Sequence, residues 1–339
     1  MNLNLCQRKP TFTDVTSAAQ RIAGRAVRTP LLESDFVNKR VGGRLLVKAE
    51  PLQVTGSFKF RGAFNRIAQL NEEERKQGIL AYSGGNHAQG VAAAAHMLGV
   101  HAIVLMPSDA PEVKIRGTQF YGAEVVLHDR WKDDRDEIAR RLIGDSGRVF
   151  VPPFDDADII AGQATVGLEI SQQAAELDAN PDAALICCSG GGLTAGAALA
   201  LKHLHPQIEV FCVEPDDFDD TRRSLISGIR ENNPVGAASI CDALLARLGE
   251  LTFSMNQQLL SGGLTVNDDE VLEAMFIAFT HLRLVVEPGG AVALAAALSG
   301  KLDLRNRTTA VVVSGGNVDP DMFRRALSLT QNRRDQMNG

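Results

Sequence analysis

Apolar and polar positions along the chain follow two alternating patterns. Short apolar runs of strand length recur between longer segments in which apolar residues return every three or four positions. The first pattern predicts buried strands and the second predicts helices. The predicted strands are Leu45–Ala49, Ile79–Ser83, Ala102–Met106, Glu124–Leu127, Val149–Val151, Leu185–Cys188, Val210–Glu214 and Ala310–Val313. The predicted helices are Thr13–Ala26, Phe60–Leu70, His87–Leu98, Pro111–Tyr121, Ile159–Leu177, Gly192–His203 and Asp268–His281. This alternation indicates an α/β protein with mostly parallel sheets flanked by helices.

Length and composition narrow the class of protein. A chain of 339 residues exceeds one ordinary hydrophobic core, so two domains are expected. The net charge of −6, with no basic run among aromatic residues, argues against binding to nucleic acid. Five cysteines, two of them adjacent, indicate reduced thiols and a cytoplasmic protein. No apolar run has the length of a membrane span, and Met1–Pro10 lacks the apolar core of a signal peptide.

The segment Gly56–Gly62 places Lys59 between Phe58 and Phe60. An amine held among apolar side chains loses hydration, which lowers its pKa and yields a neutral nucleophile able to form a Schiff base. A surface lysine that extends past two core phenylalanines would show the same pattern. Three further segments favour the reactive amine.

Two of these segments are glycine-rich loops between a strand and a helix. Cys188-Ser189-Gly190-Gly191-Gly192-Leu193 predicts a phosphate site, because glycines let the backbone approach an anion and free N–H groups begin the helix. Ser83-Gly84-Gly85-Asn86-His87 predicts a site for a carboxylate by the same reasoning, although His87 alone is more often structural than catalytic. The third segment, Val311–Asn317, ends a β-branched run in Ser314, a neutral hydroxyl at the carboxyl edge of a sheet.

With these motifs the chain resembles the fold type II pyridoxal-phosphate enzymes (tryptophan synthase β-like) of the threonine dehydratase and serine racemase family. The resemblance extends from about Thr29 to Asp319 and includes Lys48–Lys59, Ile160–Glu169 and Val286–Ala291. It implies a large cofactor-binding domain of residues 1–52 and 153–339, and a small mobile domain of residues 53–152. It also implies a small amino-acid substrate and a homodimer or homotetramer.

The resemblance assigns roles to particular residues. Lys59 holds the cofactor covalently and later removes the α-proton. The expected cofactor-binding residues are Phe58, Lys59, Asn86, Ser189, Gly190, Gly191, Gly192, Leu193 and Ser314, with Ser314 at the ring nitrogen and Asn86 at the ring hydroxyl. The expected contacts to the substrate carboxylate are Ser83, Gly85, Asn86 and His87. The implied reaction is loss of the β-hydroxyl from L-threonine or L-serine, which gives a 2-oxo acid and ammonia. A serine at the ring nitrogen disfavours transamination, because it does not keep that nitrogen protonated as a carboxylate would.

Several features modify this picture. Glu214, the Phe218 carbonyl and Asp220 resemble the family's cation loop and predict a structural Mg²⁺ or Ca²⁺. Ser189 and Ala243 stand where the family usually has glycine. Gly84 replaces the serine that serves the family's racemases as second acid/base, so little racemisation is expected.

Other functions stay open at this stage. Within the family, the substrate could be 3-hydroxyaspartate or an intermediate of hydroxyectoine breakdown, or the activity could be serine racemisation. Gly190-x-Gly192-x-x-Ala195 also matches a dinucleotide fingerprint, which leaves an NAD-dependent oxidoreductase as an alternative. That alternative assigns no role to Lys59, Asn86 or Ser314. A non-catalytic protein that only binds pyridoxal phosphate is a further alternative.

Overall fold

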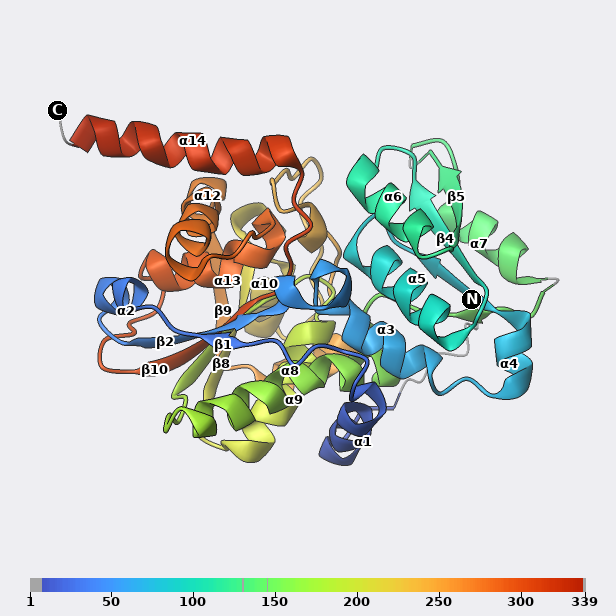
Figure 1. Cartoon of the computed structure of the whole chain (residues 1–339), viewed down its shortest axis with the longest axis horizontal. Helices are drawn as coiled ribbons and strands as arrows, with labels where there is room; N and C mark the ends of the chain where they lie inside the picture. Colours follow the sequence, from blue (N-terminus) through green and yellow to red (C-terminus); the bar gives the residue numbers. More distant parts are fainter. Residues whose placement is uncertain (1–7, 130, 145, 338–339) are drawn as a thin grey trace.

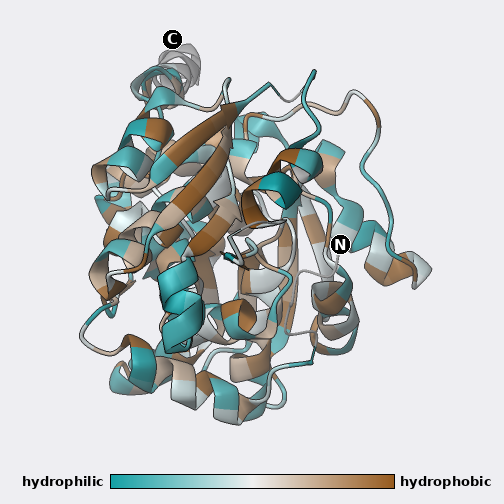
Figure 2. Cartoon of the chain, turned by 90° about the vertical axis from the view of Figure 1, so that its right-hand side faces the viewer, coloured by the Kyte–Doolittle hydropathy of each residue, from teal (hydrophilic) through white to brown (hydrophobic). Residues whose placement is uncertain are grey.

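The computed structural model describes residues 8–129, 131–144 and 146–337, which form two sheets flanked by helices (Figure 1). In Figure 2 the strands carry mostly brown residues, whereas the helices carry both teal and brown ones. Buried apolar side chains from strands and helices pack together in the core. None of the helices in the described part of the chain has the length and apolar character needed to cross a membrane.

The larger sheet has six strands in the order β1-β2-β10-β7-β8-β9. Its strands are β1 (Leu31–Leu32), β2 (Arg44–Ala49), β7 (Ala183–Cys187), β8 (Glu209–Pro215), β9 (Gly262–Val266) and β10 (Thr308–Val313). Only β1 runs antiparallel to its neighbour among these described strands. Val312 of β10 pairs with Lys48 of β2 and with Ile186 of β7. The carboxyl ends of β2, β10 and β7 therefore meet at one edge of the sheet.

The smaller sheet has four parallel strands in the order β5-β4-β3-β6. They are β3 (Ile79–Tyr82), β4 (Ala102–Pro107), β5 (Glu124–His128) and β6 (Val149–Phe150). All four lie in sequence between β2 and β7 of the larger sheet, as an inserted unit would. The expected domain limits at 52/53 and 152/153, and the mobility of the small domain, stay predictions.

Helices cover both sheets (Figure 1). Around the larger sheet lie α1 (Phe12–Ile22), α2 (Asp35–Val41), α8 (Ala157–Glu176), α9 (Gly192–Leu204), α10 (Asp220–Ser227), α11 (Glu250–Leu259), α12 (Asp268–Ile277), α13 (Pro288–Leu298) and α14 (Pro320–Met337). With the smaller sheet lie α4 (Glu72–Gln77), α5 (Asn86–Leu98), α6 (Glu112–Phe120) and α7 (Arg135–Gly144). Helix α3 (Lys59–Ile67) packs on both α5 and α8, so it joins the two units.

The α/β class and the parallel sheets predicted from the sequence are confirmed. Each predicted strand is present, with ends that differ by at most two residues. The first helix was predicted to reach Ala26 but ends at Ile22, because the chain turns at Gly24 with a φ of 70°. Helix α13 was missed because it is apolar on all sides and shows no amphipathic period.

Candidate active site

The amino end of α3 lies against the carboxyl end of β10. The Phe58 N–H donates to the Ser314 carbonyl over 3.1 Å, and Ser57 forms a bridge with Gly315. Lys59 is the first residue of α3, and its Nζ lies 5.2 Å from the centre of the Phe58 ring. The structure therefore brings Ser314 together with Phe58 and Lys59, which were predicted from a different segment of the chain.

The Lys59 amine lies in surroundings that favour its neutral form. Its Nζ donates to the Pro153 carbonyl over 2.7 Å. Burial lowers the pKa of Lys59 from 10.5 to about 8. Burial also raises the pKa of the nearby Cys187 thiol to about 12, although a hydrogen bond with Ser314 opposes that rise. Near neutral pH a useful fraction of the amine is thus unprotonated, beside a thiol that stays neutral.

The loop between β7 and α9 presents backbone N–H groups. Gly191 caps the helix with a φ of 86°, and the Ala195 N–H makes the bond to the Gly191 carbonyl over 2.9 Å. The N–H groups of Gly192, Leu193 and Thr194 come before that bond, so helix geometry provides them with no acceptor. Three such donors at the start of a helix form an anion site.

Packing explains why this loop is built from glycine. A Cβ on Gly190 would lie 2.3 Å from the Phe154 ring, and a Cβ on Gly191 would lie 2.5 Å from Leu248. Ser189, the departure from the family's glycine, has a different task. Its hydroxyl accepts from the Ala246 N–H over 3.1 Å and donates to the Ala246 carbonyl over 3.2 Å. The serine thus ties the loop to the segment that precedes α11.

The second glycine-rich loop connects β3 to α5. The Gly85 N–H donates to the Ser83 Oγ over 3.1 Å, which bends the chain into the first turn of α5. Helix α5 begins at Asn86, so the N–H groups of Asn86 and His87 point out of its amino end. This turn holds all the residues predicted to bind the carboxylate, namely Ser83, Gly85, Asn86 and His87.

The His87 ring is a structural group rather than a base or a donor to an anion. Its Nε2 lies 3.0 Å from the Val151 carbonyl, which can only accept, so Nε2 carries the proton. Burial and the charge of Lys59 lower the pKa of His87 to about 3, which keeps the ring neutral. The remaining nitrogen, Nδ1, is then an acceptor. Any contact of His87 with a carboxylate must therefore come from its backbone N–H.

Two residues to which the sequence interpretation gave no role complete the surroundings of Asn86. Its Nδ2 donates to Glu287 Oε1 over 2.5 Å, and its Oδ1 accepts from Asn317 Nδ2 over 2.8 Å. Lys114 of α6 was missed as well, and it pairs with Glu287 and Asp242. Glu287 belongs to the segment Val286–Ala291 and Asn317 ends the segment Val311–Asn317, so the sequence already indicated that both residues lie near the site.

The expected cation loop has protein partners for its carboxylates. Glu214 accepts from the N–H groups of Thr221 and Arg222 over 3.0 and 2.8 Å, at the start of α10. Asp220 accepts from the Leu248 N–H and from Asn233 Nδ2 over 2.8 and 2.9 Å. Within the described residues, no group of three or more His, Cys, Asp or Glu side chains is placed to hold a metal ion. A cation held by Glu214, Phe218 and Asp220 stays a prediction.

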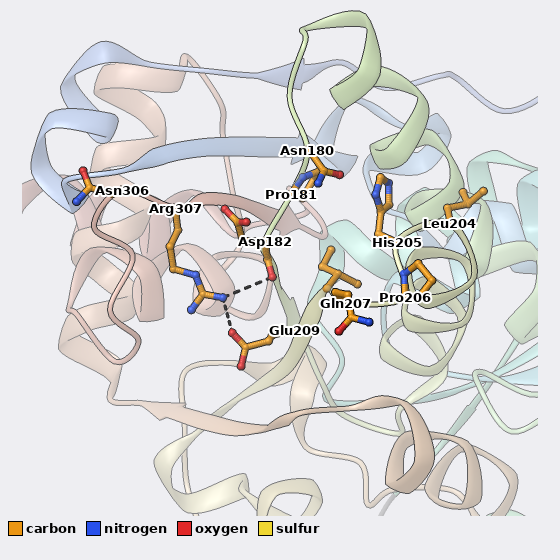
Figure 3. Close-up of a pocket in the computed structure, with 11 residues that line it drawn as sticks. Asn180, Pro181, Asp182, Leu204, His205, Pro206, Gln207, Glu209, Asn306 and Arg307 are labelled. Atoms are coloured by element: carbon orange, nitrogen blue, oxygen red, sulfur yellow. Dashed lines mark hydrogen bonds and ion pairs between the residues drawn. The ribbon is translucent and has the colours of Figure 1, made fainter.

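A cavity of about 630 Å³ lies at the opposite edge of the larger sheet (Figure 3). It is lined by Asn180, Pro181, Asp182, Leu204, His205, Pro206, Gln207, Ile208, Glu209, Asn306 and Arg307. These residues lie at or just before the starts of β7, β8 and β10, whereas Lys59 and Ser314 lie near the carboxyl ends of the strands. Arg307 is paired with Glu209 across the cavity. The cavity is therefore separate from the candidate site.

The residues at the carboxyl edge fit pyridoxal phosphate. A lysine with a lowered pKa suits an aldehyde, unpaired N–H groups at a glycine loop suit a phosphate, and the hydroxyl of Ser314 suits a neutral ring nitrogen. The loop also requires its glycines, because a Cβ on Gly190 or Gly191 would collide with Phe154 or Leu248.

Comparison with known proteins agrees with this fit. The family model described as "Pyridoxal-phosphate dependent enzyme" matches residues 22–315. The chain is 40% identical to serine racemase of Schizosaccharomyces pombe over 94% of this chain and 98% of the relative. It is 37% identical to L-threo-3-hydroxyaspartate ammonia-lyase of Saccharomyces cerevisiae over 94% and 97%. The solved structure of a threonine deaminase from T.th. superposes with a TM-score of 0.86 at 44% identity, covering 91% of this chain and 99% of that one. The chain therefore belongs to the family of pyridoxal-phosphate dependent enzymes, and its fold is the one shared by the fold type II members.

Proposed function

We propose that this enzyme is an ammonia-lyase that removes the α-proton and the β-hydroxyl of L-threonine or L-serine. The products are a 2-oxo acid and ammonia. The observation that carries the proposal is the partly buried Lys59 amine, with a pKa lowered to about 8, beside Ser314 and in contact with Pro153. Such an amine serves both as a covalent anchor and as a base near neutral pH.

Each residue of the site would have a separate role in binding the cofactor and the substrate. Lys59 anchors the cofactor, and the backbone of Ser189–Leu193 holds its phosphate. Ser314 faces the ring nitrogen, Phe58 contacts the ring, and Asn86 lies at the ring oxygen. The N–H groups of the Ser83–His87 loop hold the substrate carboxylate, which directs the α-hydrogen toward Lys59. When bound, pyridoxal phosphate supplies an electron sink for the charge left at the α-carbon.

Two observations favour elimination over racemisation. Gly84 offers no side chain that could return a proton from the face opposite Lys59. A Cβ built there would lie 3.0 Å from Pro107 and 3.6 Å from the Ala110 Cβ, so this side of the loop is closely packed. The segment Pro152–Asp155 resembles the form found in the family's dehydratases, and its Phe154 ring packs so closely on Gly190 that a Cβ there would come within 2.3 Å of it.

A substrate panel tests the proposal. L-Threonine, L-serine, L-threo-3-hydroxyaspartate and their D-isomers are incubated with the loaded enzyme, and ammonia and 2-oxo acid are measured. We expect release from L-threonine or L-serine and, by chiral analysis, little D-isomer in the remaining substrate. Preferred turnover of L-threo-3-hydroxyaspartate would move the assignment to that ammonia-lyase.

Serine racemase is the second candidate, because a relative with that name is 40% identical to this chain. Accumulation of D-serine at a rate similar to that of ammonia release would favour it. Gly84→Ser is the change expected to introduce racemisation, with Gly84→Ala as the matched control for crowding against Pro107.

A further inference from the structure

Asn86, Glu287 and Lys114 form a buried polar chain that joins the two units of the fold. Asn86 begins α5 and Lys114 lies on α6, both with the smaller sheet, whereas Glu287 precedes α13 beside the larger one (Figure 1). The exposed fractions of Asn86, Lys114 and Glu287 are 8%, 2% and 1%. Polar groups buried to this extent are costly unless each has a partner, so their mutual orientation is strongly restricted.

Hydrogen-bond chemistry determines which way the Asn86 amide faces. The Glu287 carboxylate can only accept, so the Asn86 atom 2.5 Å away must be the NH₂ group. On the other side Asn317 donates to the Asn86 oxygen over 2.8 Å, and the same Asn317 nitrogen donates to the Thr55 carbonyl over 2.7 Å. One Asn86 N–H is used by Glu287, and within the described residues no protein acceptor is recorded for the second N–H.

Lys114 keeps the Glu287 carboxylate in this accepting role. Burial raises the pKa of Glu287, and the charge of Lys114 opposes that rise. Lys114 Nζ lies 3.5 Å from Glu287 Oε2 and 2.6 Å from Asp242 Oδ2. Glu287 Oε2 has no closer hydrogen-bond donor in the described part of the chain, so the ammonium is its main source of stabilisation.

We propose that Glu287, paired with Lys114, is a positioning residue that orients the Asn86 amide so that one N–H faces the ring oxygen of the bound cofactor. This inference rests on the proposed role of Asn86 at that oxygen. Glu287 itself contacts no reacting atom in this scheme and acts through Asn86. Because Lys114 belongs to the smaller unit, the same ion pair ties the placement of α6 to the orientation of Asn86.

A double-mutant cycle on cofactor binding tests the proposal. Wild type, Glu287→Ala, Asn86→Ala and the double variant are freed of cofactor, and pyridoxal phosphate is added. Its dissociation constant and the visible absorption band of the bound form are measured against pH. We expect each single variant to weaken binding about tenfold and to shift the pH-dependent change of the band in the same direction. The double variant should be no weaker than Asn86→Ala, since a residue that acts through another has no effect once that other is gone.

Glu287→Gln provides a second variant that keeps the shape of the side chain. Its amide has one oxygen to serve both Asn86 and Lys114, so a smaller loss of the same kind is expected. Glu176→Ala, which removes an exposed carboxylate far along α8, is the matched control and should bind as wild type does. Additive losses in the cycle, or a Glu287→Ala band that titrates as in wild type, would overturn the proposal alone. An Asn86→Ala variant indistinguishable from wild type would overturn it together with the proposed role of Asn86.

Discussion

Two cationic side chains at the start of α3, Lys59 and Arg61, occupy opposite kinds of surroundings. Arg61 is fully buried and forms paired hydrogen bonds with two carboxylates, Glu50 at 2.8 and 2.9 Å and Glu169 at 2.7 and 2.8 Å. Burial alone would lower the pKa of Arg61, but the charges and hydrogen bonds of Glu50 and Glu169 raise it. Lys59 donates to one carbonyl, and among the described residues no carboxylate pairs with it.

Lys48 shows that the difference does not come from the choice of arginine over lysine. It is buried like Arg61, and its Nζ donates to the Thr29 carbonyl, Glu169 and Gln173 over 2.6, 2.6 and 2.7 Å. Burial lowers the pKa of Lys48 as well, but the charges of Glu169 and Glu50 oppose that fall, so its ammonium is held by partners and fixes the structure. A buried cation without them loses its proton easily and becomes available for chemistry. The comparison therefore separates the structural cluster around Arg61 from the reactive site around Lys59.

The largest effect is expected from Lys59→Ala. Turnover should fall by about a thousandfold or more, because both the covalent anchor and the base are lost. The fold should persist, since the side chain makes one hydrogen bond to the protein. Ammonia release and a circular-dichroism melt measure the two quantities. Lys48→Ala is the matched control and should instead lower the melting temperature. A Lys59→Ala variant with wild-type rates would refute the whole assignment.

Arg61→Met should mainly affect stability. It leaves Glu50 buried without the guanidinium that pairs with it, which costs about 3–5 kcal/mol of the free energy of unfolding. Urea unfolding of the cofactor-free protein measures this loss. Adding Glu50→Gln should recover part of it, because the uncompensated charge is then removed. A loss below about 1 kcal/mol would mean that the cluster does not hold α3 as described.

A negative charge placed in the loop between β7 and α9 tests whether this loop binds a phosphate. Gly191→Asp should weaken binding of pyridoxal phosphate about a hundredfold, through charge repulsion and contact with Leu248. Gly300→Asp is the matched control, since Gly300 also has a positive φ, 70° against 86°, but has open space around it. Fluorescence titration measures both. Equal affinity in the two variants would contradict the placement of the phosphate.

The smallest expected effect is a change in how the free energy of unfolding depends on pH. The pKa of Lys59 is about 8 in the folded chain and 10.5 as its ordinary value. Between these values the unfolded chain binds more protons, so the cofactor-free wild type should gain about 1 kcal/mol of stability for each unit of rising pH relative to Lys59→Met. Urea unfolding of both proteins from about pH 7.5 to about pH 10.5 gives the difference. Parallel curves would mean that Lys59 keeps an ordinary pKa.

Much of the site could be predicted from local sequence. The glycines of the phosphate loop, the Ser83–His87 loop and Ser314 all follow a predicted strand, and parallel strands direct their carboxyl ends to one edge. Lys59 was predicted because its own neighbours are apolar. The roles given to His87 and Glu287 needed more than this, because both depend on partners distant in the chain, Val151 for the first and Asn86 for the second.

The sequence by itself thus determined the fold class, the order of the strands along the chain and the residue types that meet at the sheet edge. These follow from periodicity and turn chemistry, which act over a few residues. Tertiary structure alone decided that Arg61 pairs with Glu169 while Lys59, two positions earlier, donates to the Pro153 carbonyl and has no carboxylate partner among the described residues. The charge state of a buried group depends on desolvation and on partners about a hundred positions away, and neither is encoded in the neighbouring residues.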